Sequence, residues 1–290
     1  MPSAQSEVSA VNERDRRRID PVTGGGPHEV QRRPASELIQ SAKTRGTLSA
    51  RSTDALAQPP IATQVQAALL RSYSVAKAGK LLLITLMPDD SGSMLGLKQG
   101  SVIAGHKELL EDMKRGPEGK RTMLQTRYLN GRTLNPFGPL DVCLPLSIDN
   151  YRCVLGTPLF EQALVMLGTV MAKTEELTSL GVQVRTASLL MTDGLSTEST
   201  EENKSTLSAE VASVIKDMRR VGDHIVAGMG FTLSERDMAY RDVFLKMGIE
   251  SHHIFPAASR EEILRAFRVF RRSAVAQLTA GSGIIRKYEG

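Results

Sequence analysis

Oxygen-bearing side chains follow an apolar segment in the first third of the chain. Residues 81–87 form an unbroken run of Leu, Ile, Thr and Met that Pro88 ends, and Asp89, Ser91 and Ser93 then occupy alternate positions. A run of this length and composition is typical of a strand buried on both faces. Because hard divalent cations prefer oxygen ligands, the spacing predicts a cation site just beyond this strand.

Two later segments offer oxygen ligands in similar settings. Thr157 precedes Pro158 at the expected start of a helix, where Thr suits the N-cap and Pro the first helical position. Asp193 follows a second apolar strand predicted over 182–191. Ligands of open α/β sheets bind beyond the carboxyl ends of the strands, where these groups can meet. The candidate metal ligands are Asp89, Ser91, Ser93, Thr157 and Asp193.

The elements around these residues alternate between strand and helix. Strands are predicted at 81–87, 121–129, 182–191, 224–231 and 252–256, and helices at 101–114, 158–171, 207–221, 235–247 and 261–278. Asn130-Gly131 favours a tight hairpin turn into a short antiparallel edge strand. The pattern predicts an α/β fold with a doubly wound, mostly parallel central sheet, one short antiparallel edge strand and helices on both faces.

The composition divides the chain into four parts. Residues 1–60 are rich in Ser, Arg, Gln, Gly and Pro and predict a disordered or weakly ordered tail, in which 34–42 could form a short helix that docks on a partner. A lead-in helix is expected at 61–79, the folded domain at 80–280, and a C-terminal tail at 281–290.

Whole-chain composition argues against several classes of protein. The 290 residues carry a net charge of +5 but only 4% aromatic residues and no Trp, which disfavours a nucleic-acid binder that stacks bases. No apolar run approaches the roughly 20 residues of a membrane span, and the N-terminus lacks the apolar core of a signal peptide. The two cysteines are expected to be reduced thiols. A cytoplasmic location is therefore expected.

Taken together, three segments resemble the von Willebrand factor A domain and its metal-ion-dependent adhesion site. DDSGSM at 89–94 fits the family's Asp-x-Ser-x-Ser pattern, LGTPL at 155–159 its Gly-Thr-Pro-Leu segment, and LLMTDG at 189–194 its strand ending in Thr-Asp-Gly. The resemblance covers residues 80–278. It departs from the family at Pro88, where an aliphatic residue is more usual, and between 129 and 151, which lacks a clear family pattern.

The resemblance implies that the five candidate ligands hold Mg²⁺ or Mn²⁺. A Glu or Asp of a partner protein would take the open coordination position, so the resemblance implies an intracellular adaptor or scaffold beside an ATPase or in a multi-protein assembly. The arginines of the last predicted helix offer either a second contact face for an acidic partner or a solvated surface; they are Arg260, Arg265, Arg268, Arg271 and Arg272.

A second interpretation makes the chain a Mg²⁺-dependent phosphatase or hydrolase with Asp89 as nucleophile. Phosphatases that resemble haloacid dehalogenases place a second Asp two residues on, as general acid, and this chain has Ser91 there. No Ser-His-Asp or Cys-His spacing stands out. We therefore expect a binding module and not an enzyme.

Overall fold

The structure is a computed structural model that describes residues 33–72, 79–154, 156, 158–194, 197–198, 200–232 and 239–279. Most of the predicted N-terminal tail, the end of the predicted lead-in helix and the predicted C-terminal tail lie outside these residues.

A six-stranded sheet forms the centre of the fold, in the order β3-β2-β1-β4-β5-β6. The strands are β1 (Lys80–Pro88), β2 (Thr122–Arg127), β3 (Thr133–Pro139), β4 (Gln183–Thr192), β5 (His224–Phe231) and β6 (Ile254–Ala257). Only the β2–β3 pair of this sheet is antiparallel, and β3 lies at the edge. The predicted α/β fold with one antiparallel edge strand is confirmed.

β1 is central because it is apolar on both faces. Leu81, Leu83 and Met87 belong to one hydrophobic cluster, and Leu82 and Ile84 belong to the other. Successive side chains of a strand point to opposite faces, so one unbroken apolar run supplies both clusters. The strand is buried between β2 and β4. Its carboxyl end lies at the edge of the sheet, and the candidate ligands Asp89, Ser91 and Ser93 come directly after it in the chain.

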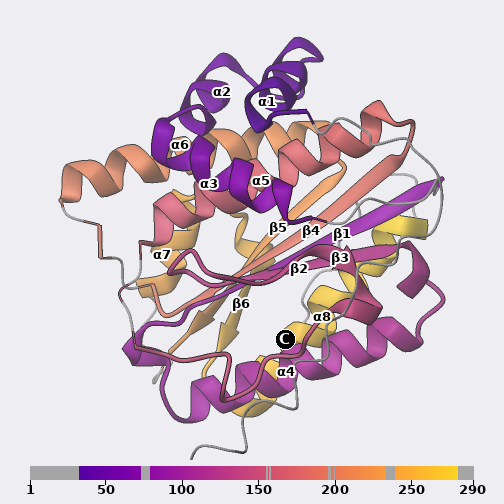
Figure 1. Ribbon diagram of the computed structural model, residues 1–290. Helices are drawn as coiled ribbons and strands as arrows, with labels where there is room; N and C mark the ends of the chain where they lie inside the picture. The colour runs from indigo at the N-terminus through magenta and orange to yellow at the C-terminus, as the bar shows by residue number, and fades with distance from the viewer. Residues whose placement is uncertain are drawn as a thin grey trace, which may run out of the picture. The chain divides into compact units, whose positions relative to one another are not determined.

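Helices cover both faces of the sheet (Figure 1). One face carries α5 (Leu159–Ser179), α6 (Glu201–Val221) and α7 (Ala239–Lys246), and the other carries α4 (Leu97–Arg115) and α8 (Arg260–Thr279). Among the helices of the described ranges, none combines the length and the apolar composition that a membrane span requires.

The five arginines of the last predicted helix are a candidate contact face for an acidic partner. Two of them form ion pairs within the chain. Arg268 Nε lies 2.6 Å from a Glu108 carboxylate oxygen, and Arg271 pairs with Asp112 at 3.3 Å. Both acidic residues are on α4, so these ion pairs join α8 to α4 across the outer side of the packed layer.

The Asn130-Gly131 turn forms the predicted hairpin between β2 and β3. Gly131 has a φ of 88°, which an L-residue with a side chain rarely adopts. The amide of Tyr128 donates to the Arg132 carbonyl at 2.8 Å, and the Gly131 amide donates back to Tyr128 at 3.0 Å. The turn therefore closes β2 directly onto the edge strand.

The starts of α5 and α6 differ from the prediction. α6 begins at Glu201, before the predicted start at 207, because Thr200 caps it by accepting a hydrogen bond from the Asn203 amide at 3.1 Å. Capping and acidic first-turn residues stabilise a polar helix start that carries no apolar periodicity. α5 begins at Leu159, so Pro158 precedes the first helical residue and does not occupy it.

The N-terminal part of the described chain differs most from the prediction. Residues 35–70 form α1 (Ala35–Thr44), α2 (Ala50–Leu56) and α3 (Pro59–Leu70), where the sequence predicted a weakly ordered tail as far as residue 60. These helices cover α5 and α6 on the side turned away from the sheet (Figure 1). The short helix expected at 34–42 is present as α1, and it packs against the chain's own α5.

The physical reason is that α5 is apolar on its outward side as well as toward the sheet. Leu38, Ile39 and Leu56 join the same buried cluster as the α5 side chains. Gly168 of α5 permits close contact, because a Cβ atom there would lie 3.0 Å from side-chain atoms of Leu56 and of Val65. A few apolar residues on one side of each short helix are enough to stabilise it, because α5 supplies the apolar surface on which they are buried.

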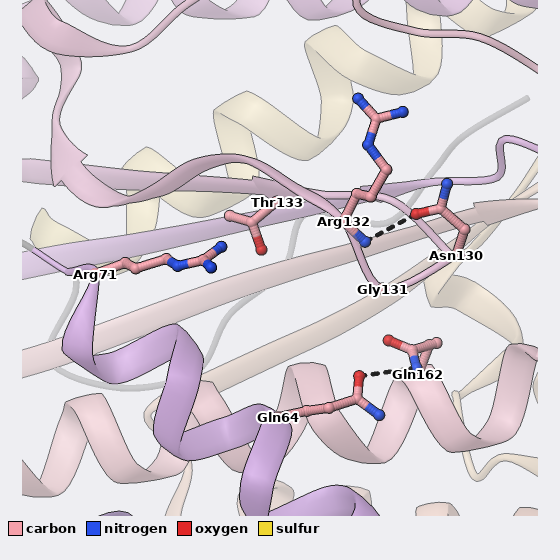
Figure 2. A pocket seen from close by; sticks show the side chains of 7 residues that line it. All are labelled: Gln64, Arg71, Asn130, Gly131, Arg132, Thr133 and Gln162. Atoms are coloured by element: carbon pink, nitrogen blue, oxygen red, sulfur yellow. Dashed lines mark hydrogen bonds between the residues drawn. The ribbon is translucent and has the colours of Figure 1, made fainter.

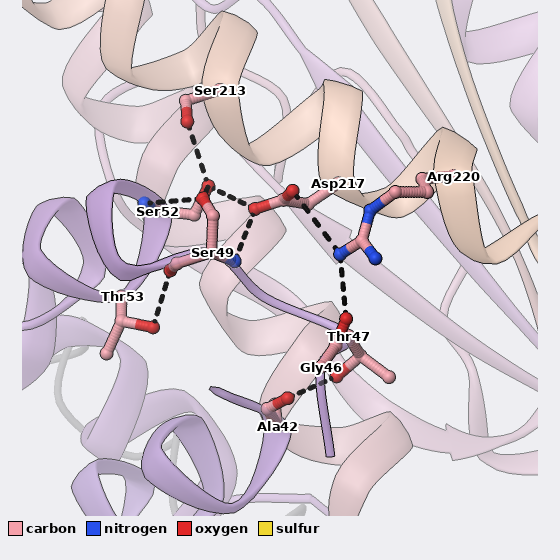
Figure 3. A network of polar contacts seen from close by, with 9 residues as sticks. All are labelled: Ala42, Gly46, Thr47, Ser49, Ser52, Thr53, Ser213, Asp217 and Arg220. Atoms are coloured by element: carbon pink, nitrogen blue, oxygen red, sulfur yellow. Dashed lines mark hydrogen bonds and ion pairs between the residues drawn. The ribbon is translucent and has the colours of Figure 1, made fainter. Parts of the chain in front are cut away.

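Polar contacts fix the loop between α1 and α2 to α6 (Figure 3). The Asp217 carboxylate accepts hydrogen bonds from the Ser49 amide at 2.7 Å and the Ser52 hydroxyl at 2.6 Å. Arg220, one turn further along α6, donates to the Gly46 carbonyl at 2.7 Å. The N-terminal helices are thus held by specific hydrogen bonds in addition to apolar packing.

We expect Asp217→Ala to lower the free energy of unfolding by about 2–3 kcal/mol, because it leaves the Ser49 amide and the buried Ser52 hydroxyl without their charged acceptor. Urea denaturation followed by circular dichroism measures the loss. Asp54→Ala, at an exposed position of α2, is the matched control and should change stability by less than about 0.5 kcal/mol. Equal stability of the two variants would contradict the docking role of Asp217.

Candidate functional site

Asp89 lies at the carboxyl edge of the sheet, between the ends of β1 and β4. Its amide donates to the Met191 carbonyl at 2.9 Å, which extends the β1–β4 ladder by one bond. Its carboxylate accepts from the Ser91 amide at 2.8 Å through one oxygen and from the Thr192 hydroxyl at 2.7 Å through the other. The side chain is 0% exposed. Asp89 therefore ties the turn after β1 to the end of β4.

The two serines of the turn present their hydroxyls together. Ser91 Oγ and Ser93 Oγ lie 2.9 Å apart. Between them the chain enters a short 3₁₀ helix, η1 (Gly92–Met94), whose last residue Met94 is buried in the core on the α4 and α8 side. Met94 therefore anchors in the core the turn that carries the two hydroxyl groups.

Asp193 reaches the same edge from β4. It directly follows Thr192, the residue that donates to Asp89, and its negative charge adds to burial in raising the pKa of the Asp89 carboxyl. Lys98, in the first turn of α4, pairs with Asp193 at 3.5 Å. Asp89, Ser91, Ser93 and Asp193 are thus brought to one edge of the sheet, whereas Thr157 lies outside the described residues.

A loop from the neighbouring segment packs against this turn. Tyr151 is buried and donates its hydroxyl hydrogen bond to the carbonyl of Asp89. The amide of Val154 donates to the Asp90 carbonyl at 3.0 Å. The chain that leads toward Thr157 is therefore attached to the Asp89 turn as far as Val154.

Asp90 and Glu198 hold neighbouring backbone in place. The Asp90 carboxylate accepts from the Asn130 amide at 3.1 Å and from the Asn130 side chain, which links the turn to the β2–β3 hairpin. Glu198 accepts from the Phe160 amide at 2.7 Å and so satisfies a backbone donor at the start of α5. Both acids support the loops at this edge through hydrogen bonds to backbone amides.

The electrostatics of this edge suit a divalent cation. Burial raises the pKa of Asp89, and the nearby charge of Asp193 adds to the shift. Burial also raises the pKa of Asp90 to about 6. Mg²⁺ and Mn²⁺ prefer carboxylate, hydroxyl and water oxygens, which are the groups that Asp89, Ser91, Ser93 and Asp193 offer. The described residues therefore fit such an ion.

A polar pocket lies beside the hairpin (Figure 2). Its lining comprises Gln64, Arg71, Asn130, Gly131, Arg132, Thr133 and Gln162. The guanidinium of Arg71 points toward Thr133 across the pocket. Asn130, the residue that holds Asp90, forms part of the wall, so this basic pocket adjoins the supports of the Asp89 turn.

Sequence patterns did not reveal several residues of this site. Lys98, Tyr151 and Glu198 act through contacts between segments distant in sequence, and no local spacing signals them. Thr192 was present in the Thr-Asp-Gly segment, but its hydrogen bond to Asp89 depends on the neighbouring positions of β1 and β4.

His106 holds the loop that carries Tyr151 and Leu146. Its Nδ1 accepts from the Leu146 amide at 3.2 Å, so the hydrogen is on Nε2, which lies 2.9 Å from the Thr126 hydroxyl oxygen. The ring is completely buried, and burial lowers its pKa to about 3. The neutral ring therefore connects α4 and β2 with the loop that carries Tyr151.

Comparisons with known proteins define the fold. No protein-family model and no curated protein matches the chain. The pilus adhesin SpaC from Lactobacillus rhamnosus GG, in its open conformation, is similar over 72% of this chain and 31% of the adhesin chain, with 14% identity and a TM-score of 0.50. A second SpaC structure gives 12% identity, 72% and 32% coverage, and a TM-score of 0.51.

Manganese-loaded TRAP from Plasmodium vivax is similar over 69% of this chain and 76% of that chain, with 14% identity and a TM-score of 0.42. The chain spans about a third of the length of SpaC. At these identities the likeness concerns the fold alone. The sheet order, its antiparallel edge strand and the SpaC likeness define a von Willebrand factor A-like fold.

Lowering the pH from 6.5 to 5 should remove about 2 kcal/mol of the stability that depends on His106, because the unfolded ring, with a pKa near 6.5, takes up a proton that the folded ring excludes. The contribution is fully present above pH 6.5 and is lost as the pH falls toward 3. Urea denaturation at both pH values measures it.

The comparison is with His106→Asn, whose side chain does not titrate. Subtracting the two pH dependences removes the opposite effect of the buried carboxyls, whose raised pKa values favour the folded state in acid. Parallel pH dependences in the two proteins would contradict the neutral, buried role of His106.

Proposed function

We propose that the chain is a metal-dependent protein-interaction module. Asp89, Ser91, Ser93, Thr157 and Asp193 hold Mg²⁺ or Mn²⁺, and an acidic side chain of a partner protein completes the coordination. The observation that carries this proposal is the meeting of the Asp89 turn and Asp193 at the carboxyl edge of the sheet, linked through Thr192. The von Willebrand factor A-like fold agrees with it.

The charge of the site supports an acidic ligand. Serine and threonine hydroxyls are neutral, so two carboxylates at most would face the cation from the protein. Asp89 is buried behind the turn, while Ser93 lies at the surface. An open position on the ion would therefore face outward, where a Glu or Asp of another molecule can reach it. The bound ion supplies a positive charge that a neutral turn cannot provide.

Exposed apolar side chains surround the turn. Leu95 and Leu97, just after the DDSGSM segment, are 59% and 65% exposed, and Val154, whose amide bonds to Asp90, is 71% exposed. Large apolar residues gathered at one surface favour a contact with another protein. An apolar rim around a central charged contact would exclude water from the coordinated carboxylate.

The geometry favours binding over catalysis. A nucleophilic Asp89 would have to reach a substrate directly, but the side chain is buried and each of its oxygens accepts a hydrogen bond; its contact with a cation at the two serines can instead run through a bound water. Ser91, two residues on, has no group that can act as a carboxylic general acid. We therefore propose a role as an adaptor or scaffold in a multi-protein assembly, such as one containing an ATPase, and not as an enzyme.

We place this role in the cytoplasm. The support is that Cys143 and Cys153 are both buried free thiols, which fits a reducing compartment. Burial raises the pKa of each thiol to about 11, so both remain protonated and chemically inert at neutral pH.

Affinity capture from cell extract tests the proposal. We expect the wild type with Mg²⁺ to retain a partner that Asp89→Ala loses at least tenfold, because the substitution removes a ligand of the bridging ion. The same partner should be released by a chelator and restored by Mg²⁺ or Mn²⁺. Quantitative mass spectrometry measures the retained proteins.

Asp149→Ala is the matched control, because it removes an exposed carboxylate from the adjoining loop without touching the turn. Its partners should equal those of the wild type. Recovery of the same partners by Asp89→Ala, or in the presence of the chelator, would contradict a metal-bridged contact.

A further inference from the structure

A second group of metal-ligating side chains lies just before β6. One ring nitrogen each from His252 and His253 and one carboxylate oxygen of Glu250 all lie within 4.8 Å of one another. This group precedes a strand of the parallel sheet, so it lies at the amino edge, opposite the edge that carries Asp89.

The local backbone brings the three side chains together. Glu250 precedes a short 3₁₀ helix, η4 (Ser251–His253), and the His253 amide donates to the Glu250 carbonyl at 2.8 Å. The two imidazole rings lie 4.0 Å apart between centroids, with planes inclined by 65°. Inclined neighbouring rings allow their nitrogens to approach a common point.

Arg219 orients the carboxylate of Glu250. One carboxylate oxygen, Oε1, pairs with Arg219 of α6, and the other, Oε2, lies 3.5 Å from Nε2 of His252. The arginine therefore occupies one oxygen and leaves the other directed at the histidine. Carboxylates that bind a metal through one oxygen are commonly held through the other in this way.

His253 is oriented in a similar manner. Its ring hydrogen-bonds to the backbone of Val226, while Nε2 of the same ring is buried and has no hydrogen-bond partner. The bond to Val226 is therefore made by Nδ1, so the hydrogen is there and the lone pair is on Nε2. Metal-binding histidines characteristically donate their second ring nitrogen to a backbone carbonyl or a carboxylate. Burial lowers the pKa of His253 to about 4, which leaves the ring neutral at pH 7.

A second buried acceptor lines the same pocket. Gln277 of α8 is 5% exposed, and its carbonyl oxygen Oε1 has no hydrogen-bond partner. Gln277, Glu250, His252 and His253 all border one cavity. A buried acceptor oxygen without a donor is costly, and a cation or its bound water would satisfy this one.

The basic residues of this pocket are largely directed to other acceptors. Arg220 donates to the Gly46 carbonyl at 2.7 Å and lies 3.6 Å from Asp217. Arg219 holds Glu250, and Lys216 is exposed. The closest contacts of the two guanidinium groups within the described chain are thus with Oε1 of Glu250, with Asp217 and with the Gly46 carbonyl, and none of these contacts is with Oε2 of Glu250.

We propose that Glu250, His252 and His253 form a site for a transition-metal ion of the zinc class, with a fourth position taken by water next to Gln277. Imidazole and carboxylate together suit Zn²⁺, Co²⁺ or Ni²⁺ and disfavour Mg²⁺. Ligand atoms about 2.0–2.2 Å from a tetrahedral zinc lie roughly 3.4 Å apart, so small side-chain rotations close the site. The site is independent of the one at Asp89.

Calorimetric titration with Zn²⁺, in buffer with excess Mg²⁺, tests the proposal. The wild type should bind one Zn²⁺ per chain at this site, and His252→Ala, His253→Ala and Glu250→Gln should each weaken the affinity at least tenfold. Asp89→Ala should bind Zn²⁺ as the wild type does, which separates this site from the proposed function. His28→Ala, which changes a histidine outside the cluster, is the control for nonspecific histidine binding.

Cobalt gives a second readout. Co²⁺ bound by nitrogen and oxygen ligands in a four-coordinate site absorbs visible light strongly, and this absorption should appear in the wild type and be absent from the double variant His252→Ala/His253→Ala. Urea midpoints without metal establish that the variants are folded. Zinc affinity that survives the double substitution, or a wild type that binds no Zn²⁺, would overturn the proposal.

Discussion

The carboxylate of Asp89 is the group on which the candidate metal site depends. It lies buried at the point where β1 ends, and burial of a carboxylate is unfavourable unless hydrogen bonds compensate for lost water. The Ser91 amide and the Thr192 hydroxyl provide that compensation from opposite sides. The same two bonds fix the turn that carries the serines and join it to the strand end that carries Asp193. Asp89 therefore has two roles: it holds the turn in place, and it belongs to the candidate ligand set.

The surrounding elements keep this turn in place. Tyr151 bonds to the Asp89 carbonyl, Asn130 bonds to the Asp90 carboxylate, and Met94 anchors the turn in the core. The loop that carries Tyr151 is in turn attached to α4 and β2 through His106. Each contact comes from a different segment, and the sheet and α4 position these segments together. Preorganised ligands of this kind bind an ion without a large conformational cost.

Local patterns were enough to predict the sheet and the position of Asp89. The apolar run of β1, the Asn-Gly turn and the strand-helix alternation each act within a few residues, so they are visible in the sequence. Short helices were expected at 34–42 and from 61 onward, but α2 and the packing of all three N-terminal helices on the domain were not predicted, because their sparse apolar residues become a stable surface only against the outward side of α5. Lys98, Tyr151 and the pairing of Glu250 with His252 likewise depend on tertiary contacts. Thr157 stays a prediction.

Anomalous X-ray diffraction from a crystal soaked in Mn²⁺ tests the central claim most directly, because it locates the ion without reference to any partner. The account predicts a strong peak at the carboxyl edge of the sheet, at a coordination distance of about 2.0–2.3 Å from Oγ of both Ser91 and Ser93. A crystal in which Lys98 stays against Asp193 and no anomalous peak adjoins the two serines would contradict it.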